Sequence, residues 1–186
     1  RQTQQRVIAD LRHDWREPAA PAPKDAASTP KVKLGNASAL LRVPRFGDDY
    51  VVPVLEGIGD DELSSGYGHF PGTAEAGEVG NYALAAHRVT HGEPLRDMPE
   101  LQPGDEVTVE TRDAIYTYEL TTDPEELVVG FEDIWVIDPL PSNPGGGVEP
   151  AQEPGQRLIT LTTCAELFHT DNRMIAFGHL VDKAAK

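Results

Sequence analysis

The sequence predicts an all-β fold, a closed barrel of about eight strands with a few short helices. Short segments rich in branched and aromatic residues recur from Leu40 onward, and turn-forming glycine, proline and aspartate separate them. Two of these segments, 106–111 and 114–120, alternate between apolar and polar residues on either side of Arg112-Asp113, which predicts a hairpin. About eight such segments can be counted, and eight strands close around an interior that side chains can fill.

In the first half of the barrel, strands are expected at 40–44 and 50–55. A short helix is expected from Asp60, which can cap its first turn, to Ser65. Residues 81–86, in which Asn81 is followed by tyrosine, leucine and alanine, are typical of a buried strand.

In the second half, the predicted hairpin is followed by a strand at 135–137 and by a long loop at 139–155, which contains Pro144-Gly145-Gly146-Gly147. The last two strands are expected at 157–163 and 174–181, because both segments alternate and are rich in branched residues. The polar residues that end the segment 165–172 predict a turn between them.

Residues 1–38 differ in composition from the rest and are expected to form an amino-terminal leader or stalk. Apolar residues at helical spacing predict a short helix within residues 4–15, although a disordered tail is the alternative. The proline- and alanine-rich segment 18–24 is expected to stay extended. Because 186 residues suffice for one well-buried domain, residues 39–186 are assigned to a single barrel domain.

The single cysteine, Cys164, directly follows one predicted strand, and Arg173 directly precedes the next. A thiolate is the attacking form of cysteine, and a thiol with a pKa of about 8.5 is mostly protonated at neutral pH unless a cation favours its ionisation. If the two strands are neighbours, Cys164 and Arg173 can face one cleft, and the guanidinium can be that cation.

A cysteine nucleophile also needs a partner that returns a proton to the leaving group. His87 is the best placed histidine, because it follows the buried strand 81–86 and would lie at the mouth of that strand. His69 is the second choice, and the remaining histidines are weaker candidates: His13, which lies in the leader, His91, His169 and His179.

Each of these residues also has a structural interpretation. A lone cysteine is often a small buried hydrophobic residue, and His87 in isolation can be a hydrogen-bonded structural residue. Arg173 can be a solvated charge at the end of a strand. Residue chemistry alone therefore leaves the catalytic and the structural interpretations both open.

Three segments together resemble the sortases, the cysteine transpeptidases of Gram-positive bacterial surfaces. They are Thr-Leu-Thr-Thr-Cys at 160–164, Arg173, and the upstream segment 80–90, and the resemblance runs from about Leu40 to the end of the chain. Segments 66–73 and 101–105 are similar to those of class E, the actinobacterial type. The resemblance implies a sortase-type barrel.

The resemblance also implies roles for individual residues. Cys164 matches the nucleophile, His87 the histidine that acts as acid and base, and Arg173 the arginine that positions the substrate and stabilises the oxyanion. Ala86 departs from the glycine that many sortases carry before this histidine; since alanine is small, we expect intact chemistry. Thr163 and Phe70 are the expected substrate-binding residues.

The activity that the resemblance implies is cleavage of a sorting signal between threonine and glycine through a thioacyl enzyme. The acyl group is then transferred to an amine of a cell-wall precursor. The expected signal is of the Leu-Ala-x-Thr-Gly type or the Leu-Pro-x-Thr-Gly type, carried by secreted surface or pilin proteins. No cofactor is expected, and we expect a monomer on the extracytoplasmic face of the membrane, held by an amino-terminal anchor that this chain, which begins with Arg1, does not include.

Two rival functions remain. A cysteine endopeptidase of the papain type has its cysteine early in the chain, at the start of a helix, whereas Cys164 follows His87 and ends a predicted strand. A catalytically silent peptide-binding barrel would tolerate the loss of Cys164 at a small cost in packing.

The charge of the chain restricts its partners and metals. A formal net charge of -15, from 16 Lys and Arg against 31 Asp and Glu, argues against nucleic-acid binding and against electrostatic docking on anionic lipid. The acidic runs at 48–49 and 123–126 lack the regular ligand spacing of a dedicated calcium loop. We therefore expect peptides or wall fragments as partners and no metal site.

Overall fold

The computed structural model describes residues 2–16, 37–87, 94–130, 133–164 and 173–186. The strands are β1 (Ala37–Arg42), β2 (Val52–Glu56), β3 (Tyr67–His69), β4 (Gly80–Ala85), β5 (Glu106–Glu110), β6 (Ala114–Leu120), β7 (Val128–Val129), β8 (Arg157–Cys164) and β9 (Arg173–Ala185). The helices are α1 (Gln2–Arg16) and α2 (Asp60–Ser65), together with the 3-10 turns η1 (Pro44–Phe46), η2 (Met98–Glu100), η3 (Pro124–Glu126) and η4 (Ile134–Ile137).

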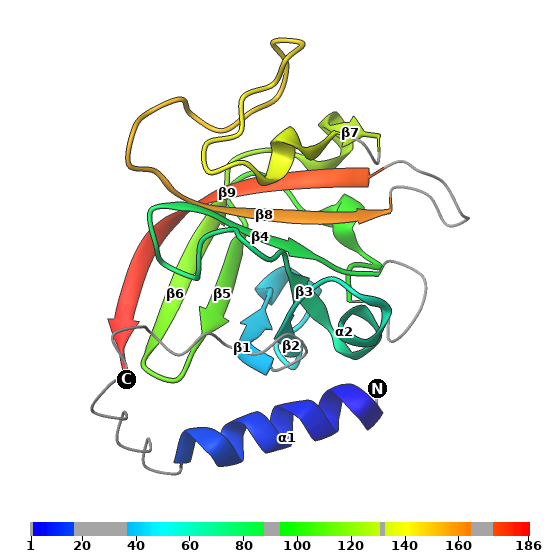
Figure 1. Cartoon of the computed structure of the whole chain (residues 1–186), viewed down its shortest axis with the longest axis vertical. Helices are drawn as coiled ribbons and strands as arrows, with labels where there is room; N and C mark the ends of the chain where they lie inside the picture. The colour runs from blue at the N-terminus through cyan, green and yellow to red at the C-terminus, as the bar shows by residue number, and fades with distance from the viewer. Residues whose placement is uncertain (1, 17–36, 88–93, 131–132, 165–172) are drawn as a thin grey trace.

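The sheet closes on itself. Its strand order is β6-β5-β1-β2-β3-β4-β8-β9, and a further antiparallel pairing between β6 and β9 joins the two ends (Figure 1). The two-residue strand β7 pairs with the beginning of β9 outside this ring. The predicted closed barrel of about eight strands is therefore confirmed.

Alternation of buried and exposed residues builds the barrel interior. In the β5–β6 hairpin, Val107 and Val109 are fully buried, while Thr108 between them is partly exposed. The interior cluster gathers side chains from strands that are distant in the sequence, including Leu41, Val54 and Leu84. Removing apolar surface from water stabilises the fold by about 25 cal/mol per Å², so this shared interior holds the strands in register.

A second, smaller apolar cluster lies on the other side of β9. Ile175 and Phe177 alternate with the interior residues of that strand and pack with Leu127 and Val136, while the Trp135 ring lies 6.1 Å from that of Phe177. The segment 134–137 forms the 3-10 turn η4, so the predicted strand at 135–137 was wrong. A short apolar run cannot by itself distinguish a buried strand from a buried turn of helix.

Two strands, β3 and β7, were not predicted. Strand β3 follows Gly66 and contains Gly68, and glycine is normally unfavourable in a strand. A side chain at Gly68 would place its Cβ 2.4 Å from the Gly57 carbonyl oxygen, and one at Gly66 would lie 2.3 Å from that of Pro53. These glycines therefore allow β3 to lie close against β2 and the segment that follows it.

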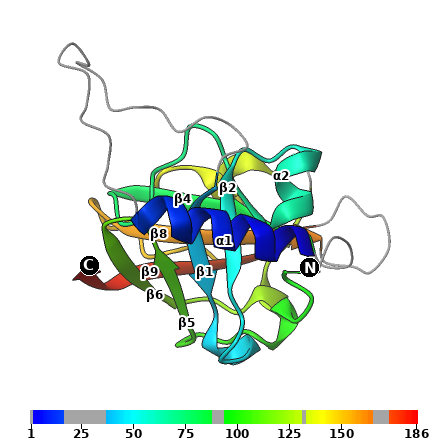
Figure 2. The same cartoon turned by 90° about the horizontal axis from the view of Figure 1, so that it is seen from below.

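The helix predicted within residues 4–15 is present as the longer helix α1, which lies against β1, β2 and α2 (Figure 2). Leu11 is 6% exposed, and the ammonium group of Lys186 lies 4.3 Å from the centre of the Trp15 ring. Among the described residues, no helix has both the length and the apolar character that a bilayer crossing requires. The division at residue 38 stays a prediction.

Gly77 is expected to be the glycine most sensitive to substitution in the connection between β3 and β4. Its φ is +80°, its N–H donates to the Tyr118 hydroxyl at 2.7 Å, and a Cβ would lie 2.1 Å from the Tyr116 ring. Gly77→Ala therefore combines overpacking with left-handed strain and is expected to cost roughly 2–4 kcal/mol, measured by urea unfolding.

Gly72→Ala is the matched control for that substitution. Gly72 lies in the same connection with a φ of +84°, but a Cβ there would meet nothing within 4 Å. Only backbone strain of about 1–2 kcal/mol is expected. Equal losses of stability in the two variants would contradict the close packing of Gly77 against Tyr116.

Candidate active site

Three adjacent strands bring the predicted catalytic segments to one end of the barrel (Figure 1). Strand β8 pairs in parallel with β4 as far as Ala85 and Thr162, and it pairs antiparallel with β9, where Cys164 lies opposite Arg173. The Ala86 N–H donates to the Thr162 carbonyl at 3.1 Å, which extends the β4–β8 pairing to the residue before His87. The expected positions of Cys164 at the end of one strand and Arg173 at the start of its neighbour are confirmed.

A pocket of about 550 Å³ opens at this end of the barrel. Four of the five predicted site residues line it: His87, Arg173, Thr163 and Phe70. His87 is half-buried two residues beyond β4, and Arg173 is half-buried at the start of β9. The structure describes the backbone of the fifth residue, Cys164, which follows Thr163 and pairs with Arg173.

Thr163 and Phe70 occupy different environments in this pocket. Thr163 is 1% exposed, and its hydroxyl donates to the Ala86 carbonyl at 2.6 Å, so it ties β8 to the residue before His87. Phe70 is half-buried, and its N–H donates to the Ala83 carbonyl at 3.0 Å. The Thr163 hydroxyl thus makes a hydrogen bond that stabilises the fold, in addition to any contact with substrate.

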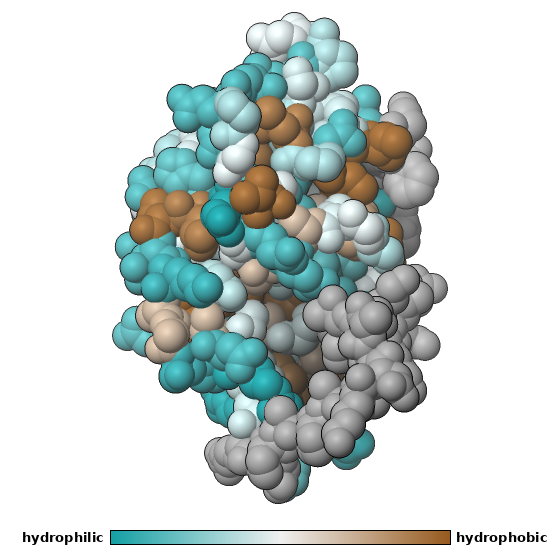
Figure 3. Space-filling model, turned by 60° about the vertical axis from the view of Figure 1, so that its left-hand side comes forward, coloured by the Kyte–Doolittle hydropathy of each residue, from teal (hydrophilic) through white to brown (hydrophobic). Residues whose placement is uncertain are grey.

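The apolar rim of the pocket was not predicted. Ile58 follows β2 and is 40% exposed, whereas Ile134 begins η4 and is 70% exposed. On the face shown in Figure 3, hydrophilic surface separates several apolar patches. Ile58 and Ile134 line one pocket although 76 positions separate them along the chain, and no local sequence signal could have joined them.

One wall of the pocket is formed by η4, and hydrogen bonds from Asn81 hold η4 in place. Asn81 is 1% exposed, and its amide nitrogen donates to the carbonyl oxygens of Val136 and Asp138, both at 3.0 Å. Its amide oxygen accepts the Thr160 hydroxyl at 2.8 Å. A polar residue within the otherwise apolar run 81–86 is the one sequence signal that could have revealed this role.

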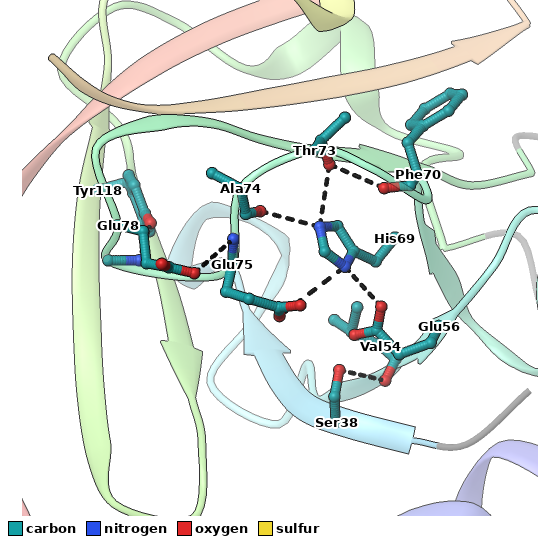
Figure 4. A network of polar contacts seen from close by, with 11 residues as sticks. Ser38, Val54, Glu56, His69, Phe70, Thr73, Ala74, Glu75, Glu78 and Tyr118 are labelled. Atoms are coloured by element: carbon teal, nitrogen blue, oxygen red, sulfur yellow. Dashed lines mark hydrogen bonds and ion pairs between the residues drawn. The ribbon is translucent and has the colours of Figure 1, made fainter. Parts of the chain in front are cut away.

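The second-choice histidine, His69, lies in a buried polar network rather than among the described residues of the pocket (Figure 4). It is 2% exposed, and its Nδ1 lies 2.7 Å from a carboxylate oxygen of Glu56. Burial alone would lower the pKa of His69, but the hydrogen bond and the charge of Glu56 outweigh it and raise the pKa above its ordinary value. A buried histidine that is bonded to a carboxylate in this way is a poor candidate for the catalytic residue that donates and accepts protons.

The two other histidines that the structure describes, His13 and His179, do not line the pocket. His13 is exposed on α1, and His179 lies on β9 opposite Leu158 and Glu119. His91 and His169 lie outside the described residues, as does the segment 165–172 that was predicted to form a turn. His87 is therefore the histidine that the described structure brings to Arg173.

Comparison with known proteins identifies relatives of this chain. The family model for the sortase domain matches residues 41–181. The chain is 38% identical to sortase SrtE1 of Streptomyces coelicolor over 159 aligned residues. The alignment covers 80% of this chain and 42% of that protein. The chain therefore spans less than half the length of this curated relative.

Solved structures share the fold. Sortase E of Streptomyces avermitilis superposes with a TM-score of 0.72 and 37% identity, covering 82% of this chain and 93% of that chain. Sortase E1 of Streptomyces coelicolor, solved with a tripeptide in the active site, superposes with a TM-score of 0.67 and 34% identity, covering 82% and 91%.

Proposed function

Because the chain belongs to the sortase family, we propose that it is a cysteine transpeptidase whose catalytic residues are Cys164, His87 and Arg173. One observation carries the assignment of these residues. His87 and Arg173 line one pocket, and the backbone of Cys164 pairs with that of Arg173 at the edge of it. This is the arrangement that nucleophilic catalysis with an acid, a base and an oxyanion donor requires.

In the first half of the proposed reaction, the Cys164 thiolate attacks the threonine carbonyl carbon of a Thr-Gly bond. The carbonyl oxygen becomes an oxyanion, and His87 in its protonated form donates a proton to the glycine nitrogen as the C–N bond breaks. The amine product leaves, and the threonine carbonyl remains bound to sulfur as a thioester.

In the second half, an incoming amine attacks the thioester carbonyl. Neutral His87 accepts the proton that the amine nitrogen loses, the C–S bond breaks, and Cys164 leaves as a thiolate. The products are a new amide and the starting thiolate–imidazolium pair. The two half-reactions use His87 once as an acid and once as a base, so no external proton source is needed.

The apolar rim supports a sorting-signal peptide as the substrate. Ile58 and Ile134 offer exposed apolar surface that can contact the leucine and alanine, or proline, side chains ahead of the Thr-Gly bond. Phe70 and Thr163 line the same pocket and are proposed to contact the peptide. Of the two expected signals, we propose Leu-Ala-x-Thr-Gly, because it is the one that the resemblance to class E implies, and the chain is similar to proteins named sortase E.

The partners and the location follow from this proposal. The acyl donor would be a secreted surface or pilin protein, and the acceptor would be an amine of a cell-wall precursor. Both are extracytoplasmic, so the enzyme would work on the outer face of the cell membrane, held there by an amino-terminal anchor.

A product assay tests the proposal. The chain is incubated with a Leu-Ala-x-Thr-Gly peptide and diglycine, and the products are identified by liquid chromatography and mass spectrometry. We expect a Thr-diglycine product and cleavage only at the Thr-Gly bond. Hydrolysis without transfer would indicate a cysteine endopeptidase, and no reaction with either Leu-Ala-x-Thr-Gly or Leu-Pro-x-Thr-Gly would favour a silent peptide-binding barrel.

Arg173→Lys is expected to lower kcat by about 10²-fold although the formal charge is kept. The planar guanidinium can donate two parallel hydrogen bonds to the substrate and its oxyanion, whereas an ammonium on a flexible stem cannot reproduce that geometry. Steady-state kinetics with the peptide and diglycine measures the loss. The control is Arg42→Lys, since Arg42 pairs with Glu110 at 2.8 Å on the β1–β5 side of the barrel; equal losses in both variants would contradict the role of Arg173.

A further inference from the structure

We propose that Glu56, His69 and Glu75 form a binding site for a divalent transition-metal ion, with zinc as the best match, separate from the candidate active site. One ligand atom from each of these residues lies within 4.8 Å of the others. Figure 4 shows both carboxylates directed at the same nitrogen of the His69 ring. No metal site was expected from the sequence, and these three residues lie in separate elements, on β2, on β3 and in the connection after β3.

Nδ1 of His69 shares a proton with the Glu56 carboxylate at 2.7 Å, and a metal ion that displaced this proton would take Nδ1 as a ligand. The His69 Nε2 lies 2.9 Å from the carbonyl oxygen of Ala74, which can only accept, so Nε2 carries a proton and donates it. The Thr73 hydroxyl lies 3.0 Å from Nε2 and donates to the Phe70 carbonyl, so it is a second acceptor of that N–H. Metal-binding histidines are commonly oriented in this way, with the outer nitrogen donating to a carbonyl.

The distances around Nδ1 suit a small cation. The Glu56 oxygen lies 2.7 Å from Nδ1, and the Glu75 oxygen lies 3.9 Å from it. Ligand atoms around a tetrahedral zinc ion, each about 2.0–2.2 Å from the metal, are roughly 3.4 Å apart. The two measured separations lie on either side of this value, so small side-chain movements would convert the cluster into three zinc ligands.

Glu56 provides independent evidence for a missing partner. The residue is 7% exposed, and its second carboxylate oxygen has no hydrogen-bond partner among the described residues. A buried carboxylate oxygen without a partner is costly, and a metal ion that contacts the carboxylate would remove that cost.

The ligand set favours zinc over calcium. Two carboxylates and a neutral imidazole balance the charge of a divalent ion. A ligand set that mixes nitrogen and oxygen suits zinc, whereas calcium takes six to eight oxygen ligands. Glu75 has a 56% exposed side chain and lines a second pocket of about 390 Å³. An ion can therefore enter from solution, and water can occupy a fourth position.

A metal ion bound here would cross-link the connection between β3 and β4 to the barrel and restrict its movement. Glu56 belongs to β2 and Glu75 to the connection, so a shared ion would join the two through His69. Phe70, which follows His69 directly, lines the candidate active site. Zinc would thus stabilise the backbone that presents Phe70 to a bound peptide.

The test measures zinc binding to the full chain carrying Cys164→Ala, so that no thiolate competes for the metal. Isothermal titration calorimetry should give one zinc ion per chain, and at a hundredfold excess over Kd the Tm should rise by roughly 5–10 °C. Adding Glu75→Gln should weaken the binding at least tenfold, and because this side chain is largely exposed, the variant is expected to fold. Calcium at the same concentration should leave the Tm unchanged.

Glu153→Gln is the matched control, because Glu153 is an exposed glutamate in the loop before β8. It should leave the zinc affinity unchanged, which separates this site from diffuse binding to an acidic surface. The absence of a zinc-dependent rise in Tm, or a loss of affinity below tenfold in Glu75→Gln, would overturn the proposal. Since no catalytic readout is used, this result is independent of whether the chain transfers peptides.

Discussion

Replacing Cys164 with alanine is expected to lower the rate of peptide transfer by at least about 10⁴-fold. The chain has a single cysteine, so no second thiol can replace the nucleophile. Hydrolysis by water positioned in the pocket would remain as a slow background, but the thioester could not form and transfer to an amine would cease. The measurement is the yield of the Thr-diglycine product per enzyme under single-turnover conditions.

The folded state of this variant must be checked separately. Circular dichroism and the Tm report whether Cys164→Ala still forms the barrel, and its affinity for the uncleaved peptide reports whether the pocket is intact. A folded variant that binds the peptide and still transfers it at more than a few per cent of the original rate would contradict the role of Cys164.

His87→Ala is expected to lower turnover by between about 10³-fold and 10⁴-fold. Without the imidazole, no group would protonate the leaving glycine nitrogen in the first half-reaction or accept a proton from the amine in the second. The pH dependence of kcat/KM should also change, because the limb that reports the ionisation of His87 would be absent.

His179→Ala is the matched control for the histidine substitution. His179 is half-buried on β9 and is not among the described residues that line the pocket, so its loss should leave turnover and the pH profile essentially unchanged. Equal losses in the His87 and His179 variants would show that the effect is structural and would contradict an acid and base role for His87.

The elements that the sequence predicted well are those with a long, regular pattern. The β5–β6 hairpin was predicted because both arms alternate, and the structure pairs Glu106 with Glu119 and Glu110 with Ile115. Strand β3 was missed because Gly68 serves a close backbone contact that depends on distant residues. The error at 135–137 also involves distant residues, since the Val136 carbonyl in η4 accepts a hydrogen bond from Asn81 on β4.

The positions of some residues of the candidate site could also be predicted from the sequence, whereas those of others could not. That Cys164 and Arg173 are neighbours could be predicted, because two adjacent strands joined by a short segment place their joined ends together. The position of His87 beside them depends on the parallel pairing of β4 with β8, which local sequence does not encode. The contacts around His69 were beyond prediction, since they join β2, β3 and the connection after β3.

The covalent intermediate provides the most direct test of the central claim, which is acyl transfer through Cys164. The chain is mixed with a Leu-Ala-x-Thr-Gly peptide without an amine, quenched in acid and digested with trypsin, which releases residues 158–173 as one peptide. The account predicts that this peptide carries the Leu-Ala-x-Thr acyl group on Cys164 and that hydroxylamine removes it. Product formation with no adduct on this peptide, or with the acyl group mapped to another residue, would contradict the account.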